Sequence, residues 1–207
     1  MNKIITIGRE FGSGGRELGR RVADELDYAY YDREIITMIA KRADVPVSYI
    51  DTFVERKPAM TIPVHVGQTF YGDVDYLQEQ SLEVFKVQCE ILKEVSERSN
   101  CVIVGRAADH ILSEFYPLRI FVYADMDSKI KRCRENGVNV AKMSDKELRK
   151  QIQDIDEHRK AYYEFYTGKR WSDRLNYDVC VNSSGVSLEK LAKCIAILSD
   201  SLAVAKI

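Results

Sequence analysis

Short runs of apolar residues alternate with amphipathic stretches along most of the chain. Runs that are apolar at successive positions are typical of strands buried on both faces of a parallel sheet. Five such runs are present, at residues 3–7, 29–31, 101–104, 119–123 and 179–181. Because strand-like and helix-like segments alternate, the pattern predicts an open α/β sheet of about five parallel strands.

The stretches between these strands carry apolar residues at helical spacing. They predict helices at residues 15–26, 33–42, 47–53, 76–98, 127–136, 145–165 and 188–204. Ser144 and Glu147 form a capping-box pattern at the start of the sixth helix, and Ser187 is placed to cap the last. Residues 56–75 and 137–143 fit neither pattern. The first is too long for an ordinary connection, and both a lid or binding loop and an unstructured surface loop agree with it.

A glycine-rich loop directly follows the first strand. It contains Gly8, Gly12, Gly14 and Gly15, and helix-forming residues begin at once behind it. Glycines allow backbone N–H groups to point into one concavity, and the amides of a helix N-terminus add partial positive charge. The segment therefore predicts a cradle for a triphosphate, although a turn that only joins strand to helix is the simpler alternative.

The loop departs from the usual phosphate-loop pattern, in which Lys and Ser/Thr follow the last glycine. Gly15 stands at the lysine position and Arg16 at the position of the magnesium-binding hydroxyl. A guanidinium binds phosphate oxygens in a bidentate fork, so Arg16 could supply the missing charge. The nearest hydroxyl is that of Ser13.

Composition limits the classes of function. The 207 residues suffice for one domain, and the net charge of −1 gives no support to nucleic-acid polymers or membranes as partners. Residues 129–170 nevertheless hold 12 Lys/Arg against 7 Asp/Glu, which suits a phosphorylated small molecule. The five cysteines form no CxxC pair, so we expect free, buried thiols in a reducing cytoplasm and neither disulfides nor metal ligands. No signal-peptide pattern or bilayer-length apolar run is present, which also favours a cytoplasmic protein.

Polar residues stand directly after several predicted strands. Ligands of open α/β folds bind at the carboxyl ends of the strands, so these residues define a candidate site. Asp32 follows the second strand and could bind a ribose hydroxyl, a base amino group or Mg²⁺, or could simply cap the helix that follows. Arg106 follows the third strand behind a glycine and is placed to bind a phosphate. Asp127, after the fourth strand, is interpreted as a helix cap.

The basic helix near residue 156 joins charge to aromatic residues. Asp156, Arg159 and Tyr163 share one helix face. A solvated, ion-paired helix over an aromatic core would explain some of this pattern. Arginines on such a segment can also close over a transferring phosphoryl group, and Arg159 has the best placed neighbours for this role.

Five segments together resemble the cytidylate kinase-like family, a branch of the P-loop nucleoside monophosphate kinases. They are ITIGREFGSGGRELG at 5–19, YYDREII at 30–36, VIVGRAAD at 102–109, RIFVYAD at 119–125 and DIDEHRKAYYEFYTGKRW at 154–171. The resemblance implies a three-layer P-loop fold in a single domain, 1–207, with an acceptor-binding insert at 30–75 and a helical, arginine-bearing lid at 137–174. Ala107 stands where the family pattern has an acceptor-site aspartate, although Asp109 is near.

The resemblance also implies roles for individual residues. Arg16 and Arg159 are expected to be catalytic, and Asp32, Arg106 and Asp109 to contact the acceptor. Contacts to ATP or its phosphates are expected from Gly8, Gly12, Ser13, Gly14, Gly15, Arg16, Glu17 and Arg132. ATP and Mg²⁺ are the implied cofactors, and no residue is predicted as a dedicated metal ligand.

The expected activity is phosphoryl transfer from ATP to a small acceptor, a nucleoside monophosphate such as CMP or dCMP. Two alternatives remain at this stage. The altered loop also fits a nucleotide-binding regulatory protein without catalysis, and Phe70 and Tyr71 in the long loop could shape a pocket for a non-nucleotide metabolite. The sequence leaves the oligomeric state open.

Overall fold

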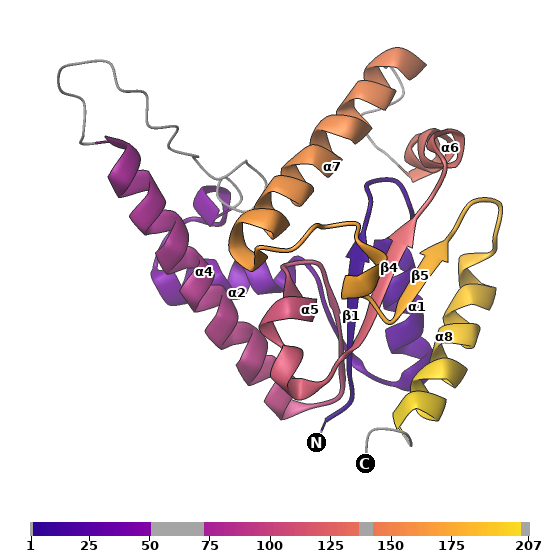
Figure 1. Cartoon of the computed structure of the whole chain (residues 1–207), viewed down its shortest axis with the longest axis horizontal. Coiled ribbons are helices and arrows are strands. Elements are labelled where there is room, and N and C mark those ends of the chain that lie inside the picture. The colour runs from indigo at the N-terminus through magenta and orange to yellow at the C-terminus, as the bar shows by residue number, and fades with distance from the viewer. Residues whose placement is uncertain (1, 51–72, 137–142, 204–207) are drawn as a thin grey trace.

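The computed structural model describes residues 2–50, 73–136 and 143–203. Its centre is one parallel sheet of five strands in the order β2-β3-β1-β4-β5. The strands are β1 (Ile4–Arg9), β2 (Ala29–Tyr31), β3 (Cys101–Val104), β4 (Leu118–Tyr123) and β5 (Val179–Asn182). This arrangement confirms the α/β class and the five parallel strands expected from the apolar runs (Figure 1).

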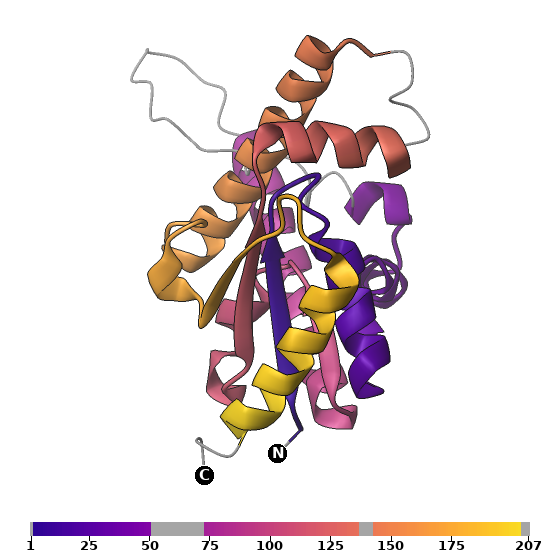
Figure 2. The ribbon, with the colours of Figure 1, turned by 90° about the vertical axis from the view of Figure 1, so that its right-hand side faces the viewer.

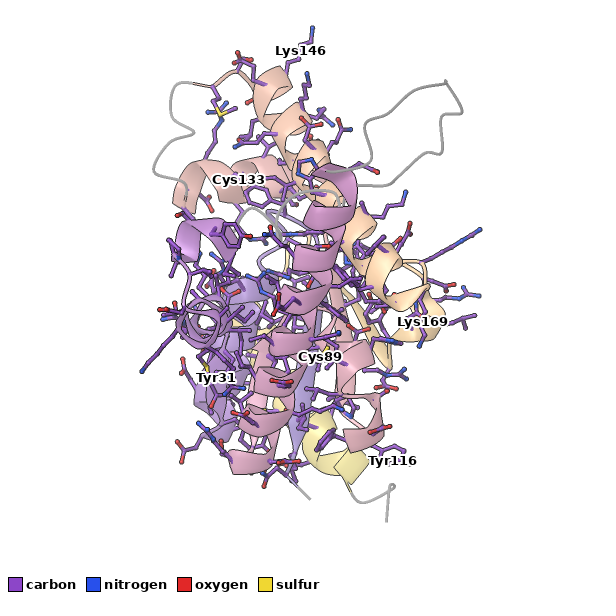
Figure 3. All side chains as sticks on the ribbon, turned by 90° about the vertical axis from the view of Figure 1, so that its left-hand side faces the viewer. Tyr31, Cys89, Tyr116, Cys133, Lys146 and Lys169 are labelled. Carbon is purple, nitrogen blue, oxygen red and sulfur yellow. The ribbon has the colours of Figure 1, made fainter. Side chains whose placement is uncertain are left out.

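Helices cover both faces of the sheet, which gives three layers (Figure 1). One face is covered by α1 (Gly15–Leu26) and α8 (Leu188–Ala203), which pack on alternate residues of β1, β3 and β4. The other face is covered by α2 (Glu34–Ala43), α4 (Asp73–Arg98) and α5 (Ala108–Ile111). Figure 3 shows the molecule from this second side, where α4, with Cys89 labelled, lies nearest the viewer. The three central strands are therefore buried on both sides, as their continuous apolar runs require.

Two further helices lie above the carboxyl ends of the strands (Figure 2). They are α6 (Met126–Asn136) and α7 (Asp145–Thr167), and Ile130 of α6 packs with Leu148 and Ile152 of α7. The far end of α7 contacts α4, where the rings of Phe85 and Tyr166 stack 4.0 Å apart. Short 3-10 turns at Ser113–Phe115 and Arg174–Asn176 complete the described elements. This packing holds α7 across the edge of the sheet where ligands of such folds bind.

Several local predictions can be compared with the structure. The capping box of Ser144 and Glu147 is present at the start of α7. The cap of α6 was assigned wrongly: Asp125 accepts the Ser128 amide at 2.7 Å, whereas Asp127 is exposed and pairs with Arg149. A turn residue one step before the helix supplies the oxygen, because the helix begins at Met126.

The expectation of buried thiols holds for Cys101 and Cys133, whereas Cys89 is half-buried. It is wrong for Cys194 and for Cys180, which lies on the edge strand β5; both are exposed. Neighbouring elements cover only one face of this edge strand, so half-buried and exposed residues alternate along β5. Residues 47–50 are helical as predicted. Most of the 56–75 loop, including Phe70 and Tyr71, and nearly all of the 137–143 turn lie outside the described residues.

Candidate phosphate-binding and acceptor site

The loop between β1 and α1 has the backbone of an anion cradle. Gly12 and Gly14 adopt positive φ angles of 72° and 80°, a conformation that side chains with a Cβ disfavour. Helical hydrogen bonding begins where the Leu18 amide donates to the Gly14 carbonyl at 2.9 Å. Gly14 provides no side-chain cap, so the amides of the first turn, from Gly15 onward, have no acceptor within the helix. These N–H groups are available to a phosphate.

The loop is held from below by hydrogen bonds to its carbonyl groups. Arg132 donates to the Gly12 carbonyl at 2.7 Å, and Ser183 donates to the Ser13 carbonyl at 2.6 Å. The Ser13 hydroxyl itself is buried and donates to the Glu10 carbonyl at 2.8 Å. Ser13 and Arg132 were expected to contact phosphate, and in this structure their side chains stabilise the loop conformation.

A buried ion network lies beside the loop. The Lys129 side chain of α6 is only 7% exposed, and its ammonium lies 2.8 Å from Glu10 and 3.1 Å from Asp156 of α7. The second oxygen of Asp156 accepts the Phe11 amide at 2.6 Å. Burial raises the pKa of Asp156, and the Phe11 amide and the Lys129 charge oppose that shift. The network ties the loop to both helices above it, and sequence reasoning missed Lys129 because nothing nearby in the chain marks it.

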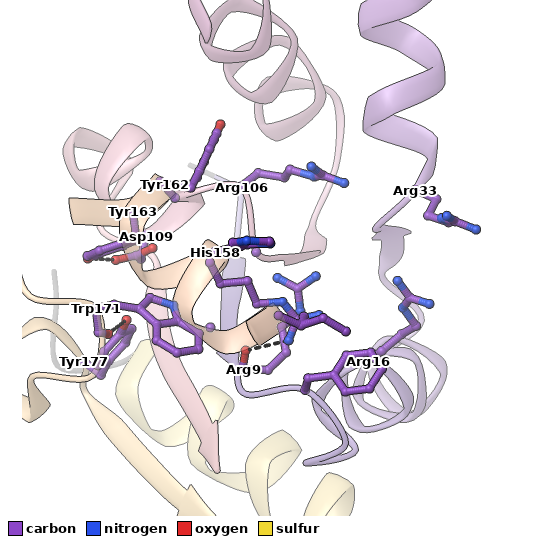
Figure 4. A pocket seen from close by; sticks show the side chains of 16 residues that line it. Arg9, Arg16, Arg33, Arg106, Asp109, His158, Tyr162, Tyr163, Trp171 and Tyr177 are labelled. Carbon is purple, nitrogen blue, oxygen red and sulfur yellow. Dashed lines mark hydrogen bonds between the residues drawn. The ribbon is translucent and has the colours of Figure 1, made fainter. Parts of the chain in front are cut away.

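Two adjacent cavities meet at the loop. The first, here the loop cavity, has a volume of about 340 Å³ and follows the glycines and the start of α1. The second, here the arginine cavity, has a volume of about 330 Å³ and lies between the strand ends and α7 (Figure 4). Four residues line both cavities: Arg9, Phe11, Arg16 and Arg159. These side chains form the shared border of the two cavities.

Arginines gather on one side of the arginine cavity. Its lining includes Arg9, Arg16, Arg33, Arg106 and Arg159 (Figure 4). The buried Asp32 carboxylate accepts Nε of Arg16 at 2.6 Å, and its other oxygen lies 3.9 Å from Nη2 of Arg9. Asp32 lines neither cavity. Burial lowers the pKa of Arg9 well below its usual range, and the nearby Arg159 charge acts in the same direction.

Arg159 projects from α7 over the loop. Its guanidinium donates to the Arg9 carbonyl at 3.2 Å and lies 5.5 Å from the centre of the Phe11 ring. It also lies 3.7 Å from Asp156, its neighbour one turn earlier. The helix-face prediction for these two residues is confirmed, and the face is directed at the cavities rather than at solvent.

The opposite wall of the arginine cavity is aromatic and contains one carboxylate (Figure 4). Asp109 accepts the Tyr163 hydroxyl at 2.6 Å, and burial raises the pKa of this carboxyl group. Trp171 packs edge-on against Phe121 at 5.4 Å. The wall is therefore apolar enough to pack against the ring of a bound molecule and polar enough to orient that molecule.

The predicted site residues fall into three groups. The arginine cavity is lined by Gly8, Arg16, Arg106, Asp109 and Arg159. The loop cavity is lined by Gly12, Gly14, Gly15, Arg16, Glu17, Arg132 and Arg159. Ser13 and Asp32 line neither. The arginine cavity is also lined by Arg33, which the sequence placed after the second strand without a role, and by Arg9 and His158, which sequence reasoning missed. The available signal for Arg9 was a charged residue close behind the first apolar run.

The loop amides fit the phosphates of ATP, whereas the described residues offer little to a metal ion. Among the described residues no three His, Cys, Asp or Glu side chains come close enough together to hold one. Arg16 replaces the usual hydroxyl of the helix start. Mg²⁺ commonly keeps several waters and binds through substrate phosphates, so it would depend on the nucleotide here.

The fold and the loop together define the class of P-loop kinase folds. A family model for the cytidylate kinase-like family matches residues 4–185, and the chain belongs to that family. No curated protein matches the chain at a significant level. No helix among the described residues is both long enough and apolar enough to cross a membrane.

Solved structures share the whole fold. An uncharacterized protein from Eubacterium ventriosum ATCC 27560 aligns with a TM-score of 0.69 at 25% identity, over 97% of this chain and 99% of its own. Shikimate kinase from Bacteroides thetaiotaomicron aligns with 0.58 at 16% identity, over 96% and 98%. A gluconokinase from Sinorhizobium meliloti 1021 aligns with 0.51 at 11% identity, over 100% and 98%. The two kinases show the fold alone.

Proposed function

We propose that this protein transfers the γ-phosphoryl group of ATP to a small anionic acceptor, a nucleoside monophosphate of the CMP or dCMP type. The observation that carries the proposal is the shared border of the two cavities, which is lined by Arg9, Arg16 and Arg159. One cavity follows the phosphate loop and the other offers an arginine-rich space with an aromatic wall. A phosphoryl group at the border would be in reach of both.

The proposed mechanism consists of positioning and electrostatic stabilisation. The amides of Gly12 to Gly15 and the first turn of α1 would hold the donor phosphates, and Mg²⁺ bound with the nucleotide would neutralise part of their charge. Arg106 binds the anionic group of the acceptor, and Arg159 stabilises charge on the group in transfer. No general base is required, because an acceptor phosphate oxygen is already anionic. Asp32 acts through Arg16, which it holds at 2.6 Å.

The test is a phosphoryl-transfer assay with ATP, Mg²⁺ and a panel of nucleoside monophosphates that includes CMP and dCMP. Formation of a nucleoside diphosphate is expected. The variant Arg16→Ala should weaken both ATP binding and turnover. The matched control is Arg42→Ala, whose exposed guanidinium pairs with Glu94 at 2.7 Å away from the site and which should behave like the wild type. If no monophosphate in the panel is phosphorylated, the proposal fails.

A regulatory protein without catalysis is the second candidate. It is favoured by the ion pair between Arg16 and Asp32, which occupies the guanidinium expected to replace the loop lysine. This candidate predicts that calorimetry detects ATP binding while the transfer assay detects no product. Turnover at ordinary kinase rates would exclude it.

A kinase of a non-nucleotide metabolite is the third candidate. A hydroxyl acceptor must lose a proton, and Asp109 is a carboxylate with a raised pKa in the wall of the arginine cavity. An acceptor screen that adds sugars and cofactor precursors to the monophosphates separates this candidate from the first.

A further inference from the structure

Arg9 is a largely buried cation whose one charged partner among the described residues is distant. Its side chain is 15% exposed, and the one charged oxygen near it is Asp32 Oδ1 at 3.9 Å, beyond hydrogen-bond distance. Within residues 2–50, 73–136 and 143–203, no group accepts a hydrogen bond from its guanidinium. Arg9 lines both cavities, so an anion that enters them from outside the chain could accept from its five N–H donors.

The side chain of Arg9 also fills the space that the loop lysine would need. A Cβ added at Gly15, the lysine position, would lie 2.5 Å from Arg9 Cβ and 3.1 Å from its Cγ. A Cβ added at Gly105 would overlap Nη1 of Arg9. The two glycines thus leave a channel through which the Arg9 side chain passes from β1 to the site. A lysine side chain at position 15 and the Arg9 side chain would occupy the same space, so the chain can have only one of them there.

Positive charge exceeds negative charge around the Arg9 guanidinium. Arg16, Arg106 and Arg159 line the same cavity, while Asp32 is the carboxylate nearest to Arg9. Asp32 already accepts Arg16 at 2.6 Å. An anion at this point would satisfy the donors of Arg9 and reduce the repulsion among its neighbours.

We propose that Arg9 binds the phosphoryl group at the border of the two cavities and takes the part of the missing loop lysine. Arg9 lines both cavities, as a residue with that role must. Asp32 is then a positioning residue that aligns Arg9 and Arg16 from behind. This inference deepens the proposed function and rests on it for the identity of the anion as a transferred phosphoryl group.

The test measures the rise in Tm that inorganic pyrophosphate gives to the full chain. At a pyrophosphate concentration about 100-fold above Kd, the wild type should gain roughly 5–10 °C. The variant Arg9→Met should bind pyrophosphate about tenfold more weakly or worse, which would cut that rise by roughly half or more. Its Tm without anion should equal or exceed that of the wild type, because the removed guanidinium donates no hydrogen bond to the described residues.

Two comparison variants make the result decisive. Arg42→Met, a surface control, should keep the full rise, and Arg16→Met should lose less of it than Arg9→Met, since Asp32 holds Arg16. A purely structural Arg9 would show the opposite pattern, with a lowered Tm and an undiminished rise. That pattern, or a full rise in Arg9→Met, overturns the inference. If Arg9→Met does not fold, Arg9→Gln is measured instead, and failure of both to fold also overturns it.

The pyrophosphate measurement needs neither acceptor nor turnover. A wild type that phosphorylates nothing would therefore defeat the proposed function while the Arg9 result stands or falls separately. If turnover is present, Arg9→Met should lower kcat more than it raises KM for the acceptor, because the interaction strengthens as charge develops in the transition state. A change in KM alone would contradict a role in transfer.

Discussion

The ion network between the phosphate loop and helices α6 and α7 makes a sharp prediction about stability. Lys129→Met removes a buried ammonium and keeps most of the side-chain volume. Two carboxylates, Glu10 at 2.8 Å and Asp156 at 3.1 Å, then lose their shared partner. Both are largely buried, with side chains 24% and 16% exposed. Removal of one member of a buried ion pair costs about 3–5 kcal/mol, and this partial exposure places the expected loss near the lower end, at about 3 kcal/mol.

The measurement is the free energy of unfolding from urea titrations at pH 7. The matched control is Lys131→Met, an exposed lysine two residues later on the same helix, which should change stability by about 0.5 kcal/mol or less. Adding Asp156→Asn to Lys129→Met should recover about 1–2 kcal/mol, since the amide removes one uncompensated charge and its oxygen can still accept the Phe11 amide.

Acidification gives a second readout of the same network. Burial already raises the pKa of Asp156, and loss of the Lys129 charge should raise it further. A carboxyl group with a raised folded-state pKa costs stability as pH rises through that pKa, so the deficit of Lys129→Met should shrink from pH 7 to pH 5. If Lys129→Met unfolds like Lys131→Met, or its deficit is independent of pH, the reasoning about the network is wrong.

Three further substitutions probe the site. Gly105→Ala places a Cβ on the path of Arg9 at a φ of +76°, so the pyrophosphate-induced rise in Tm should fall and stability should drop by about 1–2 kcal/mol; a full rise would contradict this. Asp109→Asn removes a carboxylate whose pKa is raised by burial, while its amide oxygen can still accept the Tyr163 hydroxyl. The free energy of unfolding of this variant minus that of the wild type should be more positive at pH 7 than at pH 4. Urea titrations at both pH values check the sign. Ser183→Ala removes a buried donor to a loop carbonyl and should cost about 1–2 kcal/mol in the same assay, whereas no loss would mean that the loop does not depend on it.

Predictions from the sequence succeeded where the structure depends on neighbouring residues. Apolar runs identified the five described strands. For the three central strands the reason is burial on both faces, which needs apolar residues at every position. The capping box at Ser144 was predicted because its partner lies three residues away. The buried state of Cys180 was predicted wrongly, because an edge position depends on the strand order rather than on the run itself.

The site was only partly predictable for the same reason. Arg132 was expected on a phosphate, yet it donates to the Gly12 carbonyl, a contact between residues 120 positions apart. Lys129 meets Asp156 across 27 positions. Arg9 becomes notable only when Gly105 is found beside its guanidinium. Such contacts leave no periodic signal in the chain.

The sequence by itself determined the parallel sheet, the glycine loop after the first strand and the concentration of basic residues near the site. These features follow from backbone geometry and side-chain type, which act over a few residues. The tertiary structure decided which arginine faces the shared border of the cavities, which one is held by Asp32 and which one supports the loop. The effect of a charge depends on its burial and on distances of a few ångströms to other charges, and packing between distant segments sets both.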